Sequence, residues 1–549
     1  MYHLNFNPIN PDTARGSFSF SGQFSGVRPG QTGNAFADFL LGYPASGQVG
    51  IGRSDENGRT NWFHTYVQDD WNPTRSLTIN IGLRLEVNQN MTDKDNRLSA
   101  IDLSVPGGRF VIASDSAGNI SPTAAALLPL IPIPYVTSAA AGWNPSLLRN
   151  SKLRTSPRFG FSWKLPGKSE TVLRGGYGIF LNQWAYSVQQ ALARNLPFFL
   201  LKNISVASDT PVPNFTTRNV LTSNAIGTIG GNNVDHGFRI EYAATVNLSL
   251  QHQLTPTTVV EFSYVGSNIQ GADSSTIRNV PLPGSGPIAP RRPVPALSAF
   301  NSLRWDGYSS YHAGTARIEK RLSKAFSFSA NYTFSKSIDD ASDPGSTANE
   351  TNLYQDVRNR AAERARSSFD HQHRFVASGI YELPFGEGKR YLNRTGILPA
   401  LAGGWKVTAI ASVEGGAPFT VNDQTDRANI GQGPAQRPNC LRDPNLSSGQ
   451  RTIDRYFDTS AFSQAAFGTF GDCGRNIVNG PGFKDFDLAA MKLIQFKESR
   501  RLELRLETFN LFNATNFDLP NRFAFTPNFG KIFSAGPSRQ IQLGMKFSF

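Results

Sequence analysis

Strict alternation of apolar and polar residues over a dozen positions most constrains the fold of this chain. The segment SLTINIGLRLEV, residues 76–87, has an apolar residue at every odd position from Leu77 to Val87. Side chains of a β-strand alternate between two faces, so the segment predicts one long strand with a single apolar face. A second strand candidate, NWFHTYVQDDW (61–71), precedes it across the turn NPTR. Together the two segments predict an antiparallel hairpin.

The same hairpin pattern recurs along the chain. The paired segments are SPRFGFSWKL (156–165) with TVLRGGYGIF (171–180), ATVNLSLQHQL (244–254) with VVEFSYVGS (259–267), and TARIEKRL (315–322) with FSFSANYTFSKS (326–337). We count about fourteen such segments, and most have the ~9–11 residues that a tilted strand needs to cross a bilayer.

Long irregular connections alternate with the short turns. They cover about residues 88–156, 182–236, 268–311 and 415–483, and they are rich in Pro, Gly, Ser, Asn and Asp. A soluble sheet sandwich rarely tolerates structureless loops of this length, whereas an outer-membrane barrel has short periplasmic turns and long extracellular loops. We therefore predict an all-β fold, an antiparallel transmembrane β-barrel of the outer-membrane type. A large soluble sheet with ordinary core aromatics is the alternative.

The composition agrees with strands that meet lipid on one side only. Charged residues make up 17% of the chain and aromatic residues 11%, with 40 phenylalanines, and the mean hydropathy is only −0.32. No apolar run is long enough for a transmembrane helix, and the start, MYHLNFNPIN, does not resemble a signal peptide. The net charge of +13 comes from scattered Lys and Arg residues, so we expect lipid and lipopolysaccharide as partners and no nucleic acid.

Aromatic residues near the ends of the predicted strands suggest the two interfacial girdles of a barrel, because amphipathic rings prefer headgroup depth. The predicted girdle residues are Trp62, Tyr66, Trp71, Trp163, Tyr177, Phe180, Tyr332, Phe334 and Tyr381. The opposite faces carry charged residues such as Arg84, Glu86 and Arg317, which suit a wet lumen.

The last twelve residues, SRQIQLGMKFSF, predict a further strand. Its apolar positions are Ile541, Leu543, Met545, Phe547 and Phe549. In a closed barrel this strand pairs with the first, which leaves no open edge in lipid. A chain that ends in this way resembles the C-terminal signature of bacterial outer-membrane barrels. That resemblance implies recognition by the barrel-assembly machinery.

An ordered series of phrases extends the resemblance over about residues 18–549. The phrases are YVQDDWNPTRSLTINIGLRLE, SPRFGFSW, LRGGYGIF, NYTFSKSIDDASD, FDHQHRFVASGIYELPFG, GGWKVTAIASVEGGAPFTV and RLELRLETFNLFNATNF. They are similar to the barrel half of TonB-dependent receptors, in particular the Oar-like group. The resemblance implies a barrel of about twenty-two strands with an N-terminal plug. It also implies TonB as a partner and uptake of siderophores, cobalamin, glycans or peptides.

The chain departs from that family at its N-terminal side. No signal peptide, TonB-contacting segment or plug domain is recognisable, so we expect residues 1–549 to be the C-terminal portion of a longer receptor's barrel. TonB is then a partner only if an N-terminal segment is supplied. A self-closed barrel of the visible strands is the alternative fold. The alternative function is a plugless barrel that acts as a passive pore, adhesin or surface scaffold, and a remnant without function is a third possibility.

Few residues suggest site chemistry. Asp370, His371 and His373 in FDHQHRF could contribute to a metal site, although a plain strand start explains them better. Asp339, Asp340 and Asp343 in SIDDASD could bind calcium, but a solvated acidic loop is the better interpretation because the spacing of a calcium loop is missing.

The two cysteines, Cys440 and Cys473, lie in the last long loop, where a disulfide would staple it in an oxidising compartment; two free thiols are the alternative. The glycines of RGGYG and EGGAP suit strand bends rather than phosphate binding. No residues are arranged for nucleophilic or acid–base catalysis, so we expect no enzyme activity, no cofactor and no metal.

Overall fold

The structure is a computed structural model of the chain. It describes residues 2–6, 16–26, 33–149, 152–167, 170–182, 191–205, 212–213, 215–219, 229–237, 239–343, 349–351, 353–432, 435–497 and 500–549. Parts of the connection predicted over residues 182–236 lie outside the described residues.

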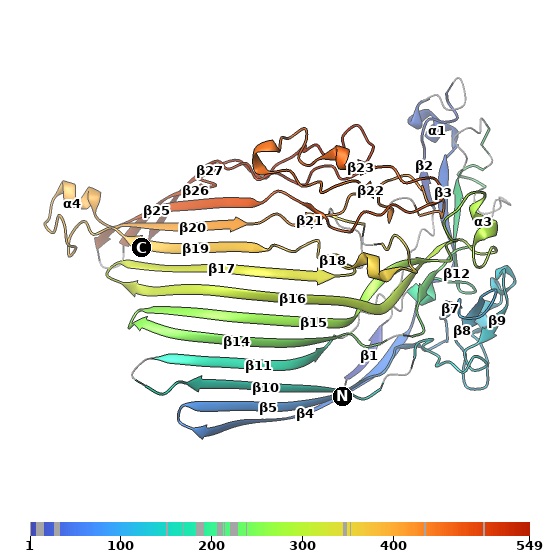
Figure 1. The fold of residues 1–549 in the computed structure, drawn as a ribbon, viewed down its shortest axis with the longest axis horizontal. Helices are drawn as coiled ribbons and strands as arrows, with labels where there is room; N and C mark the ends of the chain where they lie inside the picture. The colour runs from blue at the N-terminus through green and yellow to red at the C-terminus, as the bar shows by residue number, and fades with distance from the viewer. Residues whose placement is uncertain are drawn as a thin grey trace.

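One large, mostly antiparallel sheet of 17 strands dominates the molecule (Figure 1). Its strands are β1 (Tyr2–Phe6), β4 (Gly58–Thr74), β5 (Leu77–Asn88), β6 (Thr92–Asp93), β10 (Arg154–Lys164), β11 (Thr171–Leu181), β13 (Asn232–Val234), β14 (Tyr242–Thr255), β15 (Thr258–Arg278), β16 (Phe300–Ser323), β17 (Phe326–Asp339), β18 (Ala365–Arg366), β19 (His373–Glu382), β20 (Trp405–Glu414), β25 (Phe483–Lys497), β26 (Arg500–Phe509) and β27 (Gln540–Ser548). The predicted all-β fold is confirmed.

Successive long strands pair with their sequence neighbours, as the hairpin pattern predicts. The register keeps apolar residues together: Phe159 of β10 lies opposite Ile81 of β5 and Tyr177 of β11. Polar residues share the other side, where Arg84 lies opposite Tyr66. We call these sides the apolar face and the polar face. Cross-strand contacts on each face stabilise the sheet, and the strict alternation fixes the register.

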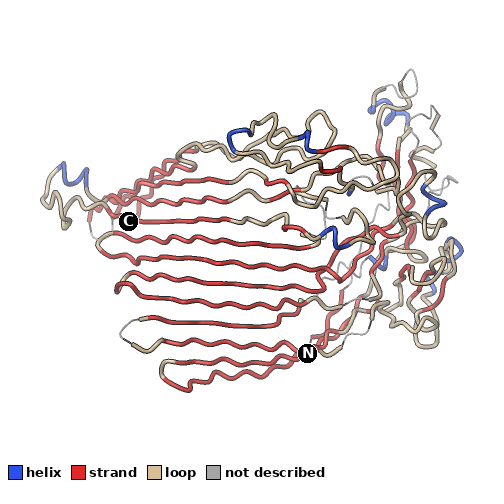
Figure 2. Tube along the Cα trace, in the orientation of Figure 1, coloured by secondary structure: helices blue, strands red, loops and turns tan. Residues whose placement is uncertain are grey.

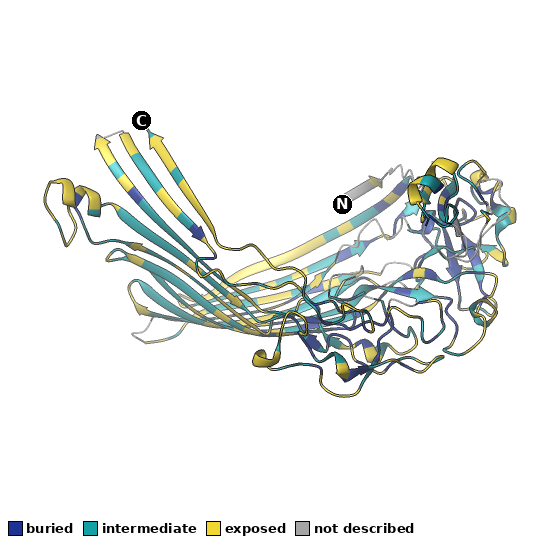
Figure 3. Cartoon of the chain, turned by 90° about the horizontal axis from the view of Figure 1, so that it is seen from above, coloured by how far each residue is buried: buried dark blue, intermediate teal, exposed yellow. Residues whose placement is uncertain are grey.

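The two edges of the sheet lie apart (Figure 3). At one edge β27 pairs with β26 from Arg501 to Phe509. At the other edge β1 covers only Gly58–Trp62 of β4, so within the described residues no register pairs the free side of β4 from Phe63 onward. The sheet is thus an open, curved wall among the described residues, and the last strand does not pair with the first.

Two strands continue far beyond the predicted membrane-crossing length. Sequence reasoning assigns residues 268–311 to a loop, but β15 extends to Arg278 and β16 begins at Phe300. That assignment is wrong because the residues that follow Gln270 bury their side chains against the loops rather than facing lipid. Trp305, for example, is only 6% exposed.

The long loops gather at one end of the sheet and carry the smaller elements (Figures 1 and 2). The strands are β2 (Ser17–Ser19), β3 (Ser46–Gly52) and β12 (Phe199–Ser205) in one small sheet, β7 (Ser99–Asp102), β8 (Arg109–Ile112) and β9 (Tyr135–Thr137) in another, and the pairs β21 (Pro418–Phe419) with β24 (Val478–Asn479) and β22 (Asn439–Cys440) with β23 (Phe462–Ser463). The helices at this end are α1 (Ala35–Leu41), α3 (Ile288–Arg291), η1 (Pro122–Ala124), η2 (Leu128–Leu130), η3 (Arg360–Glu363), η5 (Ser448–Gln450) and η6 (Thr459–Ala461), whereas α4 (Ile397–Ala402) lies at the opposite, short-turn end.

Most buried residues lie in this loop assembly rather than in the wall (Figure 3). One cluster packs Leu98, Val111 and Trp305 together, and another packs Phe419, Phe457 and Val478 beside the last loops. Among the described residues, no helix is both long and apolar enough to cross a lipid bilayer.

Candidate functional site at the loop end of the sheet

A cavity of about 500 Å³ lies where β14, β15 and β16 enter the loop assembly. We call it the loop-end cavity. Its lining is mainly guanidinium, carboxylate and aromatic groups. The lining residues are Arg154, Asp235, Gly237, Arg239, Ile240, Tyr242, Gln270, Gly271, Arg304, Trp305, Asp306, Gly307 and Tyr308. A concave site with a few convergent polar groups is the usual form of a ligand site.

A β-bulge shapes this cavity. The register between β15 and β16 shifts between Gln270 and Ala272, where Gly271 takes a φ of +72°. Across from it, a Cβ added to Gly307 would lie 2.6 Å from the carbonyl oxygen of Ala272. Both positions therefore require glycine, one for its backbone angle and one for the close approach. Beside the bulge, Trp305 lines the cavity and also packs into the buried cluster of Leu98 and Val111.

The cavity's carboxylates are already paired. Arg304 Nη2 lies 2.8 Å from Asp306 Oδ2, and its Nε lies 3.5 Å from Asp235 Oδ2. Arg360 adds a second partner to Asp306 at 2.5 Å. Within the part of the chain that the structure describes, no carboxylate forms an ion pair with Arg154 or Arg239. The cavity therefore presents unneutralised positive charge, which favours an anionic ligand.

A second cavity of about 340 Å³ shares Asp235 and Gly237 with the first. In its wall the indole of Trp143 stacks on the imidazole of His236, with ring centroids 3.8 Å apart. His236 Nδ1 donates to the carbonyl oxygen of Leu147 at 2.9 Å, which fixes the ring. This pair offers a flat surface on which a ring-bearing ligand can stack.

Asp102 and Arg109 also line the second cavity, and their Nε–Oδ2 distance is 3.0 Å. Burial alone raises the pKa of Asp102. Hydrogen bonds from Ser104 and Arg109 outweigh that effect and hold the pKa below its ordinary value. Asp102 is therefore negative at neutral pH and neutralises Arg109.

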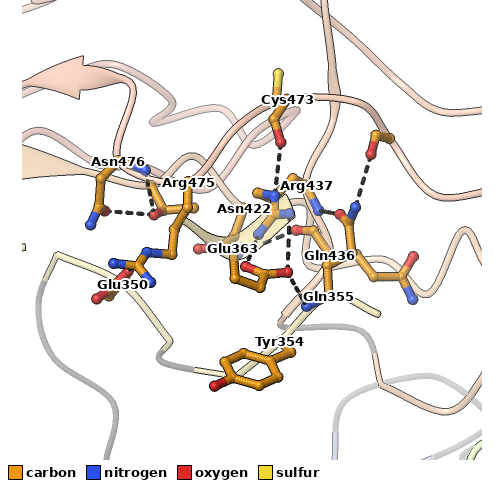
Figure 4. A network of polar contacts seen from close by, with 12 residues as sticks. Glu350, Tyr354, Gln355, Glu363, Asn422, Gln436, Arg437, Cys473, Arg475 and Asn476 are labelled. Carbon is orange, nitrogen blue, oxygen red and sulfur yellow. Dashed lines mark hydrogen bonds and ion pairs between the residues drawn. The ribbon is translucent and has the colours of Figure 1, made fainter. Parts of the chain in front are cut away.

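A buried polar network holds the neighbouring loops together (Figure 4). Arg437 Nη1 lies 2.6 Å from Glu363 Oε2, and the two side chains are 3% and 1% exposed. Arg475 Nε lies 3.0 Å from Glu350 Oε2, and Arg475 also pairs with Asp339. These ion pairs join the loop between β17 and β19 to the loop between β20 and β25. We call them the loop clamp.

Burial shifts the ionisation of the loop clamp. It raises the pKa of Glu350, which the nearby positive charge of Arg475 lowers only in part. It also raises the pKa of Tyr354 to about 12, so that this phenol stays neutral at physiological pH. Burial alone lowers the pKa of Arg475, but Glu350 and Asp339 raise it further than burial lowers it. In the loop clamp, the charged guanidinium of Arg475 therefore lies beside Glu350, a carboxyl group with a raised pKa.

The structure joins Cys440 and Cys473 in a disulfide. Cys473 belongs to the cluster of Phe419 and Phe457, and its carbonyl oxygen accepts a hydrogen bond from Arg437 Nε at 2.8 Å. The covalent link and the loop clamp thus meet in the same loop.

The metal candidates have other partners in the structure. His371 Nδ1 lies 2.7 Å from the carbonyl oxygen of Gly415, and His373 Nδ1 lies 2.8 Å from the hydroxyl of Tyr332. Asp370 accepts hydrogen bonds from Arg366 Nε and from the amide of Ser337. Among the described residues, no three potential ligands of a metal gather at one place.

Two of the three carboxylates of the acidic segment SIDDASD are shielded from solvent, contrary to the sequence interpretation, whereas Asp343 is exposed. Asp339 and Asp340 are 1% and 7% exposed. Asp339 pairs with Arg475, and Asp340 accepts a hydrogen bond from Arg360 Nε at 2.7 Å. These two carboxylates can be buried because arginines from other segments neutralise them.

The aromatic residues predicted for the girdles divide between the two faces. Trp71, Trp163, Tyr177, Tyr332, Phe334 and Tyr381 lie on the apolar face. Trp62, Tyr66 and Phe180 lie on the polar face instead, and Phe180 packs under Arg158 at 4.9 Å. The strand period explains the difference, because Tyr66 and Phe180 each stand an odd number of residues from Trp71 and Tyr177 respectively.

The C-terminal alternation lies on the apolar face of β27. Leu543 is opposite Leu506, and Met545 is opposite Leu504. These residues are strongly exposed in the isolated chain: Ile541 65%, Leu543 79%, Met545 76%, Phe547 53% and Phe549 93%.

Sequence reasoning missed the cavity residues and the loop clamp. Arg304 and Trp305 fall in the segment assigned to a loop. Arg437 and Glu363 are 74 residues apart, and nothing in either local sequence indicates the partner. One sequence signal could have predicted that the strand continues here. Leu303, Trp305 and Gly307 alternate with the polar residues of the following segment RWDGYSS.

The family model described as "Outer membrane beta barrel domain" matches residues 1–542. The chain belongs to this family. Membership assigns the protein to the outer membrane of Gram-negative bacteria, and the antiparallel wall with its loops at one end agrees with a barrel fold.

Solved outer-membrane proteins resemble the chain at low identity. The outer membrane transporter YddB from Escherichia coli has a TM-score of 0.44 at 10% identity, over 92% of this chain and 55% of that chain. The FrpB iron transporter from Neisseria meningitidis has a TM-score of 0.39 at 12% identity, over 93% and 47%. The ferripyoverdine receptor of Pseudomonas aeruginosa has a TM-score of 0.41 at 10% identity, over 90% and 39%.

The chain spans about half the length of the solved structures that it matches, between 39% and 55% for these three. No curated protein sequence matches the chain.

Proposed function

We propose that this outer-membrane barrel chain forms wall and ligand-binding loops of a TonB-dependent receptor of the Oar-like group, which takes up a large nutrient. The ordered motifs of the sequence support this proposal, and so does membership of the outer-membrane barrel family. The observation that carries it is the loop-end cavity, where Arg154 and Arg239 have no carboxylate partner among the described residues.

The side chains that line the two cavities restrict the classes of nutrient that could bind there. Arginine binds carboxylate, phosphate and catecholate oxygens through a planar fork of donors. The stacked rings of Trp143 and His236 favour a ligand with a flat or ring-shaped part. An anionic, ring-bearing ligand such as a ferric siderophore or an acidic glycan fits this combination better than a neutral peptide.

Energised uptake needs more than a wall and loops. In TonB-dependent receptors a plug fills the lumen, and a segment before the plug contacts TonB. The proposal assigns neither part to residues 1–549. The proposal assigns to residues 1–549 the capture of the ligand at the loop end. Together with a plug, these residues would also form the path across the membrane.

The contacts with the membrane and with its assembly machinery are part of the same proposal. The six aromatic residues on the apolar face would contact lipid and lipopolysaccharide at headgroup depth. The exposed alternation of β27, which ends on Phe549, would be read by the barrel-assembly machinery.

Ligand binding tests the proposal. The full chain, folded in detergent, would be titrated with a ferric catecholate, a ferric hydroxamate, cobalamin and an acidic oligosaccharide. We expect saturable binding of one anionic probe, weakened about tenfold or more by the double substitution Arg154→Gln with Arg239→Gln, because each charged hydrogen bond contributes about 1.5–3 kcal/mol. The matched control is Arg451→Gln, a loop arginine outside both cavities.

Two results would contradict the receptor function. One is the absence of saturable binding by every probe. The other is steady, ligand-independent conductance of the purified chain in a planar bilayer, which would favour the passive pore. An unchanged affinity of the double variant would move the site elsewhere.

A further inference from the structure

The connection between β19 and β20 differs from the other turns at its end of the sheet. The hairpins β4–β5, β14–β15 and β16–β17 each turn within two residues, whereas residues 383–404 form a longer insert that contains helix α4. Figure 1 shows α4 projecting beyond the strand ends, opposite the loop assembly. In an outer-membrane barrel the short turns face the periplasm. We call residues 383–404 the periplasmic insert.

The insert is fixed to the apolar face of the wall. Lys492 lies on this face, opposite Trp405 and Leu504. Its Nζ donates to the carbonyl oxygens of Ala400, Leu401 and Gly403 at 2.7–2.9 Å. These carbonyls are at the C-terminal end of α4, which carries partial negative charge and attracts a cation.

A second contact orients the helix in the same way. Trp405 Nε1 donates to the carbonyl oxygen of Leu401 at 2.9 Å, and Lys492 Nζ lies 5.2 Å from the Trp405 ring centroid. Helix α4 therefore stands on the lipid side of the wall, not over the polar face.

The helix exposes apolar side chains at that position. Ile397 is 78% exposed, Leu398 65% and Leu401 63%, whereas Pro399 is buried within the insert. Because the apolar face of the wall is covered by lipid in the outer membrane, the apolar side chains of a helix fixed to that face continue the same lipid-facing surface. Exposed leucines and isoleucines on a short helix are typical of burial at the headgroup–acyl boundary.

Basic residues precede the helix in the sequence of the insert. Lys389, Arg390 and Arg394 are exposed, and Glu387 is the one acidic residue of the insert. Lys389 also pairs with Glu382 at 3.0 Å, and the Arg390 guanidinium lies 5.3 Å from the Tyr391 ring centroid. A helix with apolar side chains next to arginines matches the two layers of a leaflet, acyl chain and phosphate.

We propose that the periplasmic insert is an anchor that binds anionic phospholipid of the inner leaflet of the outer membrane. Ile397, Leu398 and Leu401 enter the acyl layer, and Arg390 and Arg394 contact lipid phosphates. Lys492 and Trp405 set the depth, because they tie the helix to a fixed position on the wall. The proposal does not depend on ligand uptake.

Site-specific fluorescence tests the depth of α4. The full chain with Leu398→Cys is folded into phosphatidylcholine vesicles that contain phosphatidylglycerol, and an environment-sensitive fluorophore is attached to the new thiol. Cys440 and Cys473 do not react because they are joined in the disulfide. The matched control is Arg75→Cys, in the two-residue turn between β4 and β5. We expect aqueous iodide to quench the label at position 398 about threefold less than the label at position 75.

Lipid selectivity tests the basic residues. Spin-labelled phosphatidylglycerol should quench the label at position 398 more than spin-labelled phosphatidylcholine does. Since one basic residue near an anionic surface changes association about fivefold, K389Q/R390Q/R394Q should abolish this preference. Lys324→Gln, in the turn between β16 and β17, is the control and should preserve it.

Three results overturn the proposal. Equal iodide quenching at positions 398 and 75 places the helix in water. Equal quenching by the two spin-labelled lipids removes the headgroup selectivity, and a preference that survives in K389Q/R390Q/R394Q removes the role of the basic residues. A label on Leu401→Cys repeats the first measurement if the variant at position 398 does not fold.

Discussion

Arg437 and Glu363 form an ion pair 2.6 Å long that is almost wholly shielded from water, with side chains 3% and 1% exposed. The pair joins the loop before β19 to the loop before β25. Each buried charge is stabilised by its partner, so the removal of either one alone is strongly destabilising.

Arg437→Met is expected to destabilise the loop assembly by about 3–5 kcal/mol, because it leaves Glu363 as a buried, unpaired carboxylate. Limited proteolysis of the folded chain should then cut within residues 353–372 and 435–482 at protease concentrations that spare the wild type. The double variant Arg437→Met with Glu363→Leu removes both charges and should recover much of the resistance. If the double variant is as sensitive as the single one, packing rather than charge holds these loops.

The disulfide should contribute independently. Cys440 and Cys473 close a loop with a sequence separation of 33 residues, for which the chain-entropy estimate is about 3–4 kcal/mol. Reduction should therefore speed hydrogen exchange in residues 440–473 and leave exchange in β5 and β10 unchanged. The variant with both cysteines replaced by serine should match the reduced wild type, and a mismatch would point to an effect of the reductant elsewhere.

The pKa of Glu350 predicts a pH dependence with a definite sign. Burial raises this pKa above the ordinary value of 4.5, so the folded loops hold the proton to higher pH than the unfolded chain does. The associated stability is complete below the unfolded pKa and is lost as the pH rises through the raised folded pKa.

Local hydrogen exchange in the loop that follows β17 should accordingly show weaker protection at pH 7 than at pH 4, after correction for intrinsic rates. Glu350→Gln should abolish that difference, since glutamine carries no proton to lose. A wild type whose protection rises with pH would show that Arg475 dominates the carboxyl instead.

Matched substitutions on β27 test which face meets lipid. Leu543→Arg puts a charge on the apolar face and should cost about 2–4 kcal/mol at mid-bilayer depth, whereas Gln542→Arg on the polar face should cost little. Folding into lipid vesicles, followed as a change in gel mobility without heating, should show a lower folded fraction for the first variant only. Equal folded fractions would mean that this strand does not face lipid on the side of Leu543.

The wall could be predicted from the sequence because one local rule governs it. Period-two alternation predicted residues 76–87 as a strand, and β5 spans Leu77–Asn88. The same rule, applied strictly, would have separated Tyr66 from Trp71 and Phe180 from Tyr177. The girdle prediction counted aromatics near strand ends without following their parity, and so it grouped Trp62, Tyr66 and Phe180 with residues of the opposite face.

The site could not be predicted in this way, because its geometry depends on contacts between distant segments. Beyond the bulge at Gly271 both polar and apolar residues of the strands are buried, for example Ser274 and Trp305. Alternation of polar and apolar residues therefore no longer marks a strand there, and the extension to Arg278 resembles a loop in the sequence. The pairing of Arg475 with Glu350 joins positions 125 residues apart in sequence, as their numbers show. Such a pairing follows from which loops touch and not from either local segment.

The pairing of β15 with β16 continues on both sides of the bulge, and this has a mechanical consequence. The paired residues run from Thr258 with Lys320 at the short turn, through the membrane-crossing part, to Arg278 with Phe300 beyond the register shift at Gly271. Gln270 and Arg304, which line the loop-end cavity, belong to these same strands. The lining of the loop-end cavity is therefore continuous with the wall, so a force applied at this lining would act directly on the membrane-crossing parts of β15 and β16.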